Sequence, residues 1–170
     1  MIDKRNFYIN GRWIKPIKPN DFEVINPSTE ESFAKISLGS KDDTNAAVAA
    51  AKNAFINWKE TNKEEKINFL EKLLKVYKKR FNEMAEAMSM EMGAPIDYAL
   101  SVHTPSGQSH IEDFILRLKN FTFGEQFDSK SNNYISYEPI GVCGLITPWN
   151  WPINQIALKV IPAIATGCTM

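Results

Sequence analysis

The chain has 170 residues, of which 44% are hydrophobic and 24% charged, the proportions of an ordinary globular protein. Its 20 basic and 20 acidic residues cancel, which gives no electrostatic basis for binding nucleic acid. No stretch approaches the roughly 18 apolar residues of a membrane span, and no apolar signal segment opens the sequence. With only 2 cysteines and no disulfide framework, we expect a cytoplasmic protein without membrane or nucleic-acid partners.

Short strand signals separated by turns occupy residues 6–38. Asn10-Gly11 lies between apolar residues and is a strong signal for a two-residue hairpin turn. The segment from Asn26 to Thr29 indicates a second turn. We therefore expect a layer of strands with a structural role.

The next section has the pattern of helices. Ser40 with Asp43, and Thr61 with Glu64, have the spacing of a capping box at a helix start. The second predicted helix ends near Gly93. Its apolar stripe, at spacings of three and four, consists of Ile67, Leu70, Leu74, Tyr77, Phe81, Met84 and Met88. Glutamates balance its lysines, which favours a solvated face over a membrane-surface helix.

Residues 94–121 predict further helix, broken around residues 105–107 by a proline and a glycine. His103 and His110 lie near this break. They are seven residues apart, with no cysteine or nearby pair of carboxylates to complete a ligand set. A metal site is therefore a poor interpretation of these histidines.

Residues 124–137 have the pattern of a hairpin. A polar turn from Asp128 to Asn133 follows Phe127, and an alternating strand runs from Tyr134 to Tyr137. An isolated two-stranded hairpin has little core of its own. We therefore expect this arm to pack on a partner surface.

The last section joins an apolar run, residues 140–146, to an apolar helix. The length and composition of the run predict a fully buried strand of a parallel sheet. Pro148 and Pro152 stiffen the corner between strand and helix. In open α/β sheets such corners lie at the carboxyl ends of the strands, where ligands usually bind. We therefore expect the chemistry of the protein at this corner.

Two polar side chains of this section have alternative interpretations. Asn150 could cap the helix with its carbonyl oxygen, or present its NH2 group as a fixed donor to negative charge. Composition and spacing alone favour the cap. Lys159 lies in a helix that is apolar nearly all round, so its ammonium must reach water or meet a carboxylate. No acidic residue follows Glu138, so a later carboxylate partner would lie outside these 170 residues.

One long motif resembles the signature of the NAD(P)-dependent aldehyde dehydrogenase superfamily. It consists of Glu138-Pro139-Ile140-Gly141-Val142-Cys143-Gly144, Ile146-Thr147-Pro148-Trp149-Asn150-Trp151-Pro152, Lys159, Pro162-Ala163 and Ala165-Thr166-Gly167. The earlier segments also fit that family in order, so the resemblance covers essentially the whole chain. Members of the family are much longer, which implies an N-terminal fragment.

The resemblance implies an α/β fold divided into three parts. Residues 1–120 would form the N-terminal segment of the NAD-binding domain, and residues 121–139 an oligomerisation hairpin arm. Residues 140–170 would form the first strand-helix unit of a Rossmann-like sheet, without the catalytic domain. The G-x-G-x-x-G fingerprint is absent, because Gly141 and Gly144 alone are too weak to count. The family binds its dinucleotide with a variant sheet instead.

The resemblance also assigns roles to residues of the corner. Asn150 would hold the oxyanion of the tetrahedral intermediate, and Lys159 would relay charge with the general-base glutamate. Trp151 would line the aldehyde tunnel. The backbone that holds NAD or NADP would come from Ile146, Thr147, Pro148 and Trp149.

In the family reaction a cysteine thiolate attacks an aldehyde, hydride passes to the nicotinamide, and a glutamate activates the water that releases the acid. The nucleophile and the base lie beyond residue 170 in this family, and neither Cys143 nor Cys168 replaces the nucleophile. We therefore expect the isolated chain to be inactive and the longer protein to be a homodimer or homotetramer. Two alternatives remain open: a non-catalytic module that pairs with a full-length homologue through residues 121–139, or a fragment of a relative that transfers the acyl group to coenzyme A.

Overall fold

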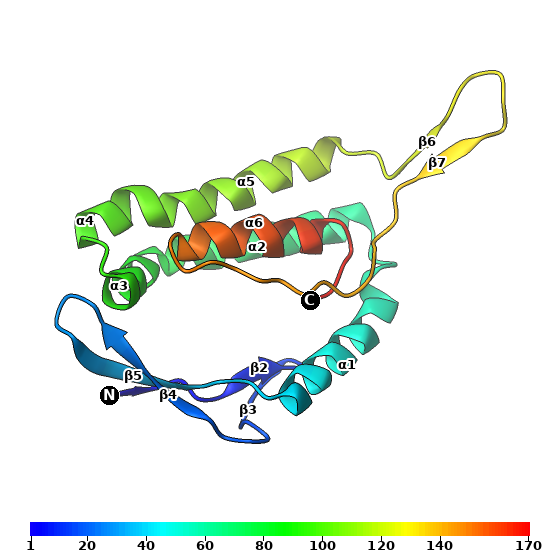
Figure 1. Cartoon of the computed structure of the whole chain (residues 1–170). Coiled ribbons are helices and arrows are strands. Elements are labelled where there is room, and N and C mark those ends of the chain that lie inside the picture. The colour runs from blue at the N-terminus through cyan, green and yellow to red at the C-terminus, as the bar shows by residue number, and fades with distance from the viewer.

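The computed structural model describes residues 1–170 as a strand layer, a group of packed helices and a projecting arm (Figure 1). The strands are β1 (Ile2–Asp3), β2 (Phe7–Ile9), β3 (Arg12–Ile14), β4 (Asp21–Asn26), β5 (Glu31–Ser37), β6 (Gly124–Gln126) and β7 (Tyr134–Ser136). The helices are α1 (Lys41–Trp58), α2 (Lys63–Lys79), α3 (Phe81–Met92), α4 (Ile96–Tyr98), α5 (Thr104–Asn120) and α6 (Pro152–Ala165), with a π-helical turn at Ala99–His103. This architecture confirms the α/β class predicted from the sequence.

The strand layer has β5 at its centre, parallel to β1 and antiparallel to β4. Strands β2 and β3 form a separate hairpin. Asn10 (φ 54°) and Gly11 (φ 74°) both adopt the left-handed conformation that a two-residue hairpin turn requires, which confirms that prediction. The second predicted turn is also present, and closes where the Glu30 amide donates to the Asn26 carbonyl at 2.8 Å.

Helix α1 begins with the predicted capping box. The Asp43 amide donates to Ser40 Oγ at 3.3 Å, and the Ser40 amide donates to Asp43 Oδ2 at 2.8 Å. The other carboxylate oxygen of Asp43 accepts a bond of 2.8 Å from the Ile17 amide. Asp43 therefore ties the loop after β3 to the start of α1.

The second predicted capping box was wrong by one residue. Asn62, not Thr61, caps α2, and its side-chain oxygen accepts from the Glu65 amide at 2.9 Å. The Thr61 hydroxyl instead donates to the Asn57 carbonyl at the end of α1. Thr61 thus satisfies a carbonyl at the end of α1, and Asn62, which is the stronger N-cap residue, caps the start of α2.

The single helix predicted to run as far as Gly93 is two helices. Arg80 (φ −104°, ψ 18°) leaves the helical region and separates α2 from α3. The Phe81 ring then packs edge-on against Tyr77, with ring centroids 6.5 Å apart. Gly93 ends α3 with φ 76°, as predicted.

The break in the next helical section lies earlier than residues 105–107, where we predicted it. It is the π-helical turn at Ala99–His103. Pro105 lies in the first turn of α5, where a missing N–H costs little. Gly107 is a helical residue at a close contact: a Cβ there would lie 2.5 Å from Tyr77 Oη and 2.7 Å from Ile153 Cγ1. The glycine therefore allows α5 to approach α2 and α6.

The main core lies where α6 packs along α5 and against α2. Its buried residues are Ile67, Leu70, Tyr77, Met88, Ile111, Ile115, Leu118, Ile153, Ala157, Ile161 and Ala165. Ile156 and Leu158, on the other side of α6, are exposed. Although its sequence is apolar nearly all round, α6 is therefore buried on one side only. None of the helices is both long and apolar enough to cross a bilayer.

The buried strand predicted for residues 140–146 is not formed. Ile140 is 90% exposed and Ile146 is 87% exposed. Only Val142 makes a parallel bridge, to Thr169. A strand needs a ladder of hydrogen bonds to a neighbour, and here Thr169 alone provides one. The apolar run is therefore paired at one point only.

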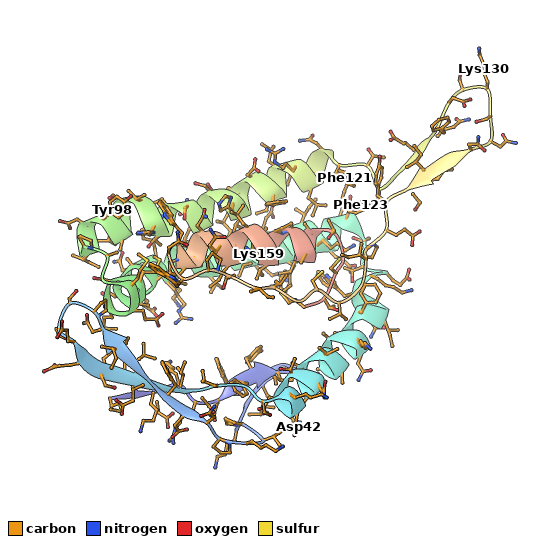
Figure 2. The ribbon with its side chains drawn as sticks, viewed as in Figure 1. Asp42, Tyr98, Phe121, Phe123, Lys130 and Lys159 are labelled. Atoms are coloured by element: carbon orange, nitrogen blue, oxygen red, sulfur yellow. The ribbon has the colours of Figure 1, made fainter.

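The predicted arm is present as the antiparallel pair β6 and β7. It projects from the end of α5, and Lys130 lies at its tip (Figure 2). Phe127 on the arm is 64% exposed. The arm has no core of its own, as its sequence predicted.

The capping box of Ser40 and Asp43 predicts a contribution to stability that is lost in acid. Hydrogen bonds from the Ile17 amide and from Ser40 hold the pKa of Asp43 below its ordinary value of 3.8. Because the folded pKa is depressed, the stabilisation is fully present above pH 3.8 and is lost as the pH falls through the folded pKa. Asp43→Asn should therefore lower the melting temperature at neutral pH, and the difference from wild type should shrink below pH 3.8.

Thermal unfolding followed by circular dichroism between neutral and acid pH measures this effect. Asp42→Asn is the matched control, since exposed Asp42 makes only a surface ion pair of 3.1 Å with Lys18 and should cost less. Equal losses for the two variants at neutral pH would contradict the role of Asp43.

Candidate active site at the proline corner

The corner between the apolar run and α6 is held by backbone and prolines. Pro152 is the first residue of α6, where its missing N–H has no partner to lose. Trp151 precedes it with φ −143° and ψ 67°, and its carbonyl accepts from the Gln155 amide at 2.9 Å. No side chain caps the helix. The backbone path alone thus fixes where Asn150 stands.

Asn150 is exposed on this corner, and its carboxamide makes no hydrogen bond within the chain. The capping interpretation of Asn150 is therefore wrong for this structure. Its NH2 group keeps both hydrogens free to donate. A donor that has no competing partner is suited to binding negative charge.

Trp151 anchors the corner to the π-helical turn. Its ring packs against the ring of His103, with centroids 4.5 Å apart, and His103 in turn packs edge-on against Tyr98 at 5.1 Å. Burial lowers the pKa of His103, so the imidazole is neutral at physiological pH. Its buried Nδ1 has no hydrogen-bond partner. The contact of this histidine with Trp151 is therefore one of ring packing.

The segment from Ile146 to Trp149 leaves its backbone groups free. None of its N–H or C=O groups makes a hydrogen bond within the chain. Beside it lies a hollow of about 620 Å³. The hollow is lined by Thr147, Pro148, Trp149, Pro152 and Ile156, and on its other side by Pro27, Glu91 and Met92. Free backbone donors and acceptors beside a hollow can bind a polar ligand.

Lys159 lies near the middle of α6 (Figure 2). It is half-buried, and its ammonium donates to Gln155 Oε1 at 3.3 Å without meeting a carboxylate. A rise of about 1.5 Å per residue places it roughly 10 Å along the helix from Pro152. The structure thus brings Asn150 and Trp151 together at the corner and holds Lys159 about two turns away.

Two histidines contact this region in ways that the sequence analysis missed. His103 packs on Trp151, and His110 Nε2 lies 2.7 Å from Asn154 Oδ1 on α6. Both contacts depend on the packing of α5 against α6. No periodicity or motif in the sequence indicates them, because each joins residues more than 40 positions apart.

Comparison with known proteins gives the same family along nearly the whole chain. The model of the aldehyde dehydrogenase family matches residues 13–170. A 3-succinoylsemialdehyde-pyridine dehydrogenase of a Pseudomonas species is 44% identical over 171 residues, which cover 100% of this chain and 35% of that protein.

Solved structures agree. The crystal structure of an aldehyde dehydrogenase from Bartonella henselae matches with a TM-score of 0.96 and 53% identity, over 99% of this chain and 36% of that one. A mutant of aldehyde dehydrogenase C from Pseudomonas syringae, in complex with NAD+ and octanal, matches with a TM-score of 0.93 and 41% identity. That match covers 96% of this chain and 33% of the other.

The chain belongs to the aldehyde dehydrogenase family. The resemblance found in its sequence is confirmed, and its structure matches the N-terminal part of the family's fold. The chain spans about a third of the length of the relatives that it matches.

The free carboxamide of Asn150 predicts that its removal leaves the fold intact. Asn150→Ala should change the free energy of unfolding by less than about 0.5 kcal/mol, because the side chain has no partner to lose. Ser40→Ala is the matched control. It removes a true cap from α1 and should cost about 1 kcal/mol. Urea unfolding of both variants measures the difference, and a loss at Asn150 as large as that at Ser40 would restore the capping role.

Proposed function

We propose that this chain supplies one wall of the active site of an NAD(P)-dependent aldehyde dehydrogenase, which oxidises an aldehyde to a carboxylic acid through a cysteine thiohemiacetal. The observation that carries the proposal is the exposed, unbonded carboxamide of Asn150 on a rigid corner, in a chain of this family. The nucleophilic cysteine and the general-base glutamate come from outside these residues. The chain alone is therefore inactive.

Asn150 acts on the charge that develops during the attack. When a thiolate adds to the aldehyde carbon, the carbonyl oxygen becomes an oxyanion. A donor already fixed in position stabilises that oxyanion without reorganising. The two prolines and the packing of Trp151 on His103 provide the fixed position.

The dinucleotide site is proposed at Ile146, Thr147, Pro148 and Trp149. Their free backbone groups and the adjoining hollow of about 620 Å³ fit a polar ligand. The relatives from Pseudomonas syringae and Mycobacterium tuberculosis hold NAD+ in their crystal structures, at 41% and 29% identity to this chain. When bound, the nicotinamide would accept the hydride from the former aldehyde carbon once the cysteine has added to it. We propose NAD or NADP as the cofactor on this support.

Trp151 and Lys159 complete the proposed wall. Trp151 would present its ring to the aldehyde, steadied by His103 behind it. Lys159 is half-buried and has only the neutral Gln155 as a partner, so it can exchange charge with the general-base glutamate. We propose this relay on that support.

The three-part division of the chain fits the same scheme. Residues 1–120 would form the N-terminal segment of the NAD-binding domain, and residues 140–170 its first strand-helix unit. Residues 121–139 would form the assembly arm. A cytoplasmic location is part of the same proposal, as for other enzymes that draw on the soluble NAD(P) pool.

The proposed function is tested best in a full-length enzyme that contains these 170 residues. Residues 1–170 can be joined to the remainder of the Bartonella henselae enzyme, which is 53% identical in the shared part. In this chimera Asn150→Ala should lower kcat by about 10² to 10³, because the oxyanion loses its donor. The affinity for NAD+, measured by fluorescence titration, should be unaltered.

Asn68→Ala is the matched control, since Asn68 is an exposed asparagine on α2. It should leave kcat unchanged. An active chimera whose kcat does not respond to Asn150→Ala would overturn the role of Asn150.

A second candidate function, assembly, is supported by the arm. It projects from the helices with Phe127 exposed at 64%, a large apolar side chain without a partner in the chain (Figure 1). We propose that residues 121–139 pack on another copy of the protein, as a homodimer or homotetramer, or on a full-length homologue. In that case the arm functions without any catalytic residue.

Phe127→Ser should shift the chimera towards monomer, because it removes the apolar contact of the arm. Light scattering after gel filtration measures the mass. Lys130→Ala, at the tip of the same arm, is the control and should not shift it. A chimera that is monomeric before any substitution would contradict assembly.

A further inference from the structure

The two cysteines of the chain lie together at the far end of α6. The parallel bridge between Val142 and Thr169 is closed by hydrogen bonds from the Cys143 amide to the Thr169 carbonyl, 2.7 Å, and from the Thr169 amide to the Gly141 carbonyl, 3.2 Å. Successive side chains of extended backbone alternate between faces, so Cys143 and Cys168 share the face opposite Val142 and Thr169. The two thiols lie close enough to shift each other's pKa.

Several donors converge on the sulfur of Cys168. The Thr166 hydroxyl donates to it at 3.6 Å, and the amides of Ile140 and Gly141 and the Cys143 thiol lie near it. Burial raises the pKa of Cys168, but these neighbouring groups outweigh burial and hold it below the ordinary value. Burial raises the pKa of Cys143. Cys168 is therefore the thiol that ionises first, and a thiolate is the nucleophilic form.

A buried cation lies beside this sulfur. Lys66 is 5% exposed and has neither a carboxylate within ion-pair distance nor a hydrogen-bond acceptor. Its ammonium lies next to Gly167, where a Cβ would be 3.0 Å from Nζ, and 5.4 Å from the centre of the Phe123 ring. Burial lowers the pKa of Lys66, whereas the charges of Cys168 and Glu60 raise it. A thiolate at Cys168 would add to the counter-charge that Glu60 gives this ammonium.

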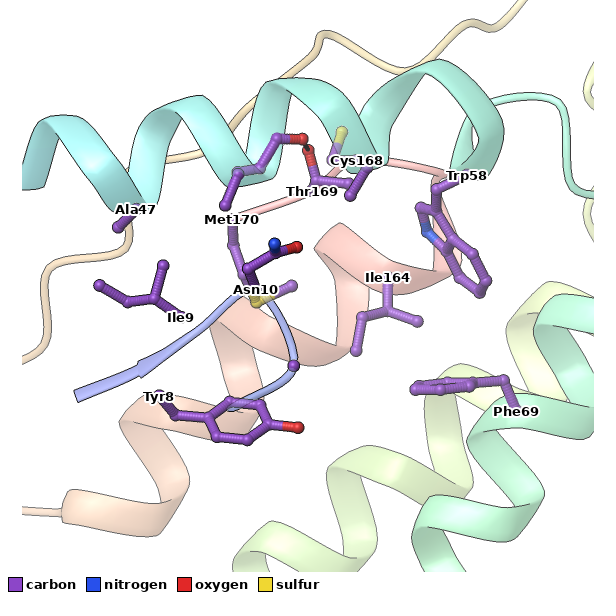
Figure 3. Close-up of a pocket in the computed structure, with 14 residues that line it drawn as sticks. Tyr8, Ile9, Asn10, Ala47, Trp58, Phe69, Ile164, Cys168, Thr169 and Met170 are labelled. Atoms are coloured by element: carbon purple, nitrogen blue, oxygen red, sulfur yellow. Dashed lines mark hydrogen bonds between the residues drawn. The ribbon is translucent and has the colours of Figure 1, made fainter. Parts of the chain in front are cut away.

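A hollow adjoins Cys168. Cys168, although 4% exposed, lines a hollow of about 560 Å³ between the β2–β3 turn and α1 (Figure 3). Figure 3 shows Cys168 beside Thr169, on the same side of the hollow as Met170. The hollow is at the opposite end of α6 from Pro152, roughly 20 Å along the helix. Chemistry here is separate from the proposed role of the corner.

We propose that Cys168 and Cys143 form a dithiol site that reduces peroxides, and that the two cysteines are oxidised to a disulfide in the process. The Cys168 thiolate attacks one peroxide oxygen, the O–O bond breaks, and the displaced hydroxide takes a proton to leave as water. Cys143 then attacks the sulfur of the resulting sulfenic acid, and its S–H proton leaves with the hydroxyl as a second water. In sum, two thiols and one hydrogen peroxide give one disulfide and two waters.

The disulfide would add a covalent link to a segment that few hydrogen bonds hold to the rest of the chain. The apolar run 140–146 is joined to the helices by the single bridge at Val142. A covalent link from Cys143 to Cys168 would hold this run beside Thr169. Oxidation would thus fix the strand that leads into the corner.

The experiment treats the purified 170-residue chain with a small excess of hydrogen peroxide and stops the reaction with catalase. Remaining thiols are alkylated with iodoacetamide in denaturant, and peptides are mapped by mass spectrometry without reduction. The expected product is a peptide pair cross-linked between Cys143 and Cys168 of one molecule. Recovery of both cysteines as alkylated thiols, or cross-links only between molecules, would overturn the proposal.

Variants assign the two roles. Cys143→Ser should leave a sulfenic acid on Cys168 that dimedone traps. Lys66→Met should slow disulfide formation about tenfold by removing the charge beside the thiolate. Lys72→Met, an exposed lysine on the same helix, should not slow it. Dimedone on Cys143 instead, or equal rates for the two lysine variants, would overturn the assigned order or the role of Lys66. The cross-link is measured in the wild-type chain, so this test of the proposal does not depend on whether the variants fold.

Discussion

The close approach of α5 to α6 at Gly107 is the contact on which the rest of the structure depends. A side chain there would collide with Ile153 of α6 and with Tyr77 of α2, so only glycine lets the three helices meet. The contact between α5 and α6, called the α5–α6 seam below, buries Ile111, Ile115 and Ala157. It holds α6 at a fixed distance from α2. A helix positioned this firmly gives the corner at its start a defined place in space. Filling the seam would move that corner with it.

The two ends of α6 carry the two kinds of chemistry that the chain offers. At its start, Asn150 stands unbonded beside Trp151, held from the helix side because the preceding run has only one bridge. At its end, Gly167 leaves room for the Lys66 ammonium, whose pKa the charge of Cys168 raises. The helix therefore separates the proposed oxyanion donor from the thiol pair.

Local signals in the sequence predicted the local structure well. The Asn10-Gly11 turn, the Ser40 cap and the hairpin arm each depend on neighbouring residues, and each is present. Features that depend on distant contacts were not predictable in this way. Residues 140–146 have the composition of a buried strand, but a strand forms only beside a neighbour, and here only Thr169 provides one. The packing of His103 on Trp151 arises from the α5–α6 seam, which no periodicity encodes. The family motif indicated the corner, while the free state of Asn150 became visible only in the structure.

The central claim is that this chain carries the oxyanion wall of an aldehyde dehydrogenase site and not its nucleophile. The most direct measurement is the absorbance of NADH when the purified 170-residue chain is incubated with NAD+ and octanal, the ligands of the Pseudomonas syringae structure. We predict no NADH above the protein-free blank for the chain or for its Cys143→Ser and Cys168→Ser variants. NADH production by the wild-type chain that disappears in either variant would contradict the account, because it would make one of these cysteines the nucleophile.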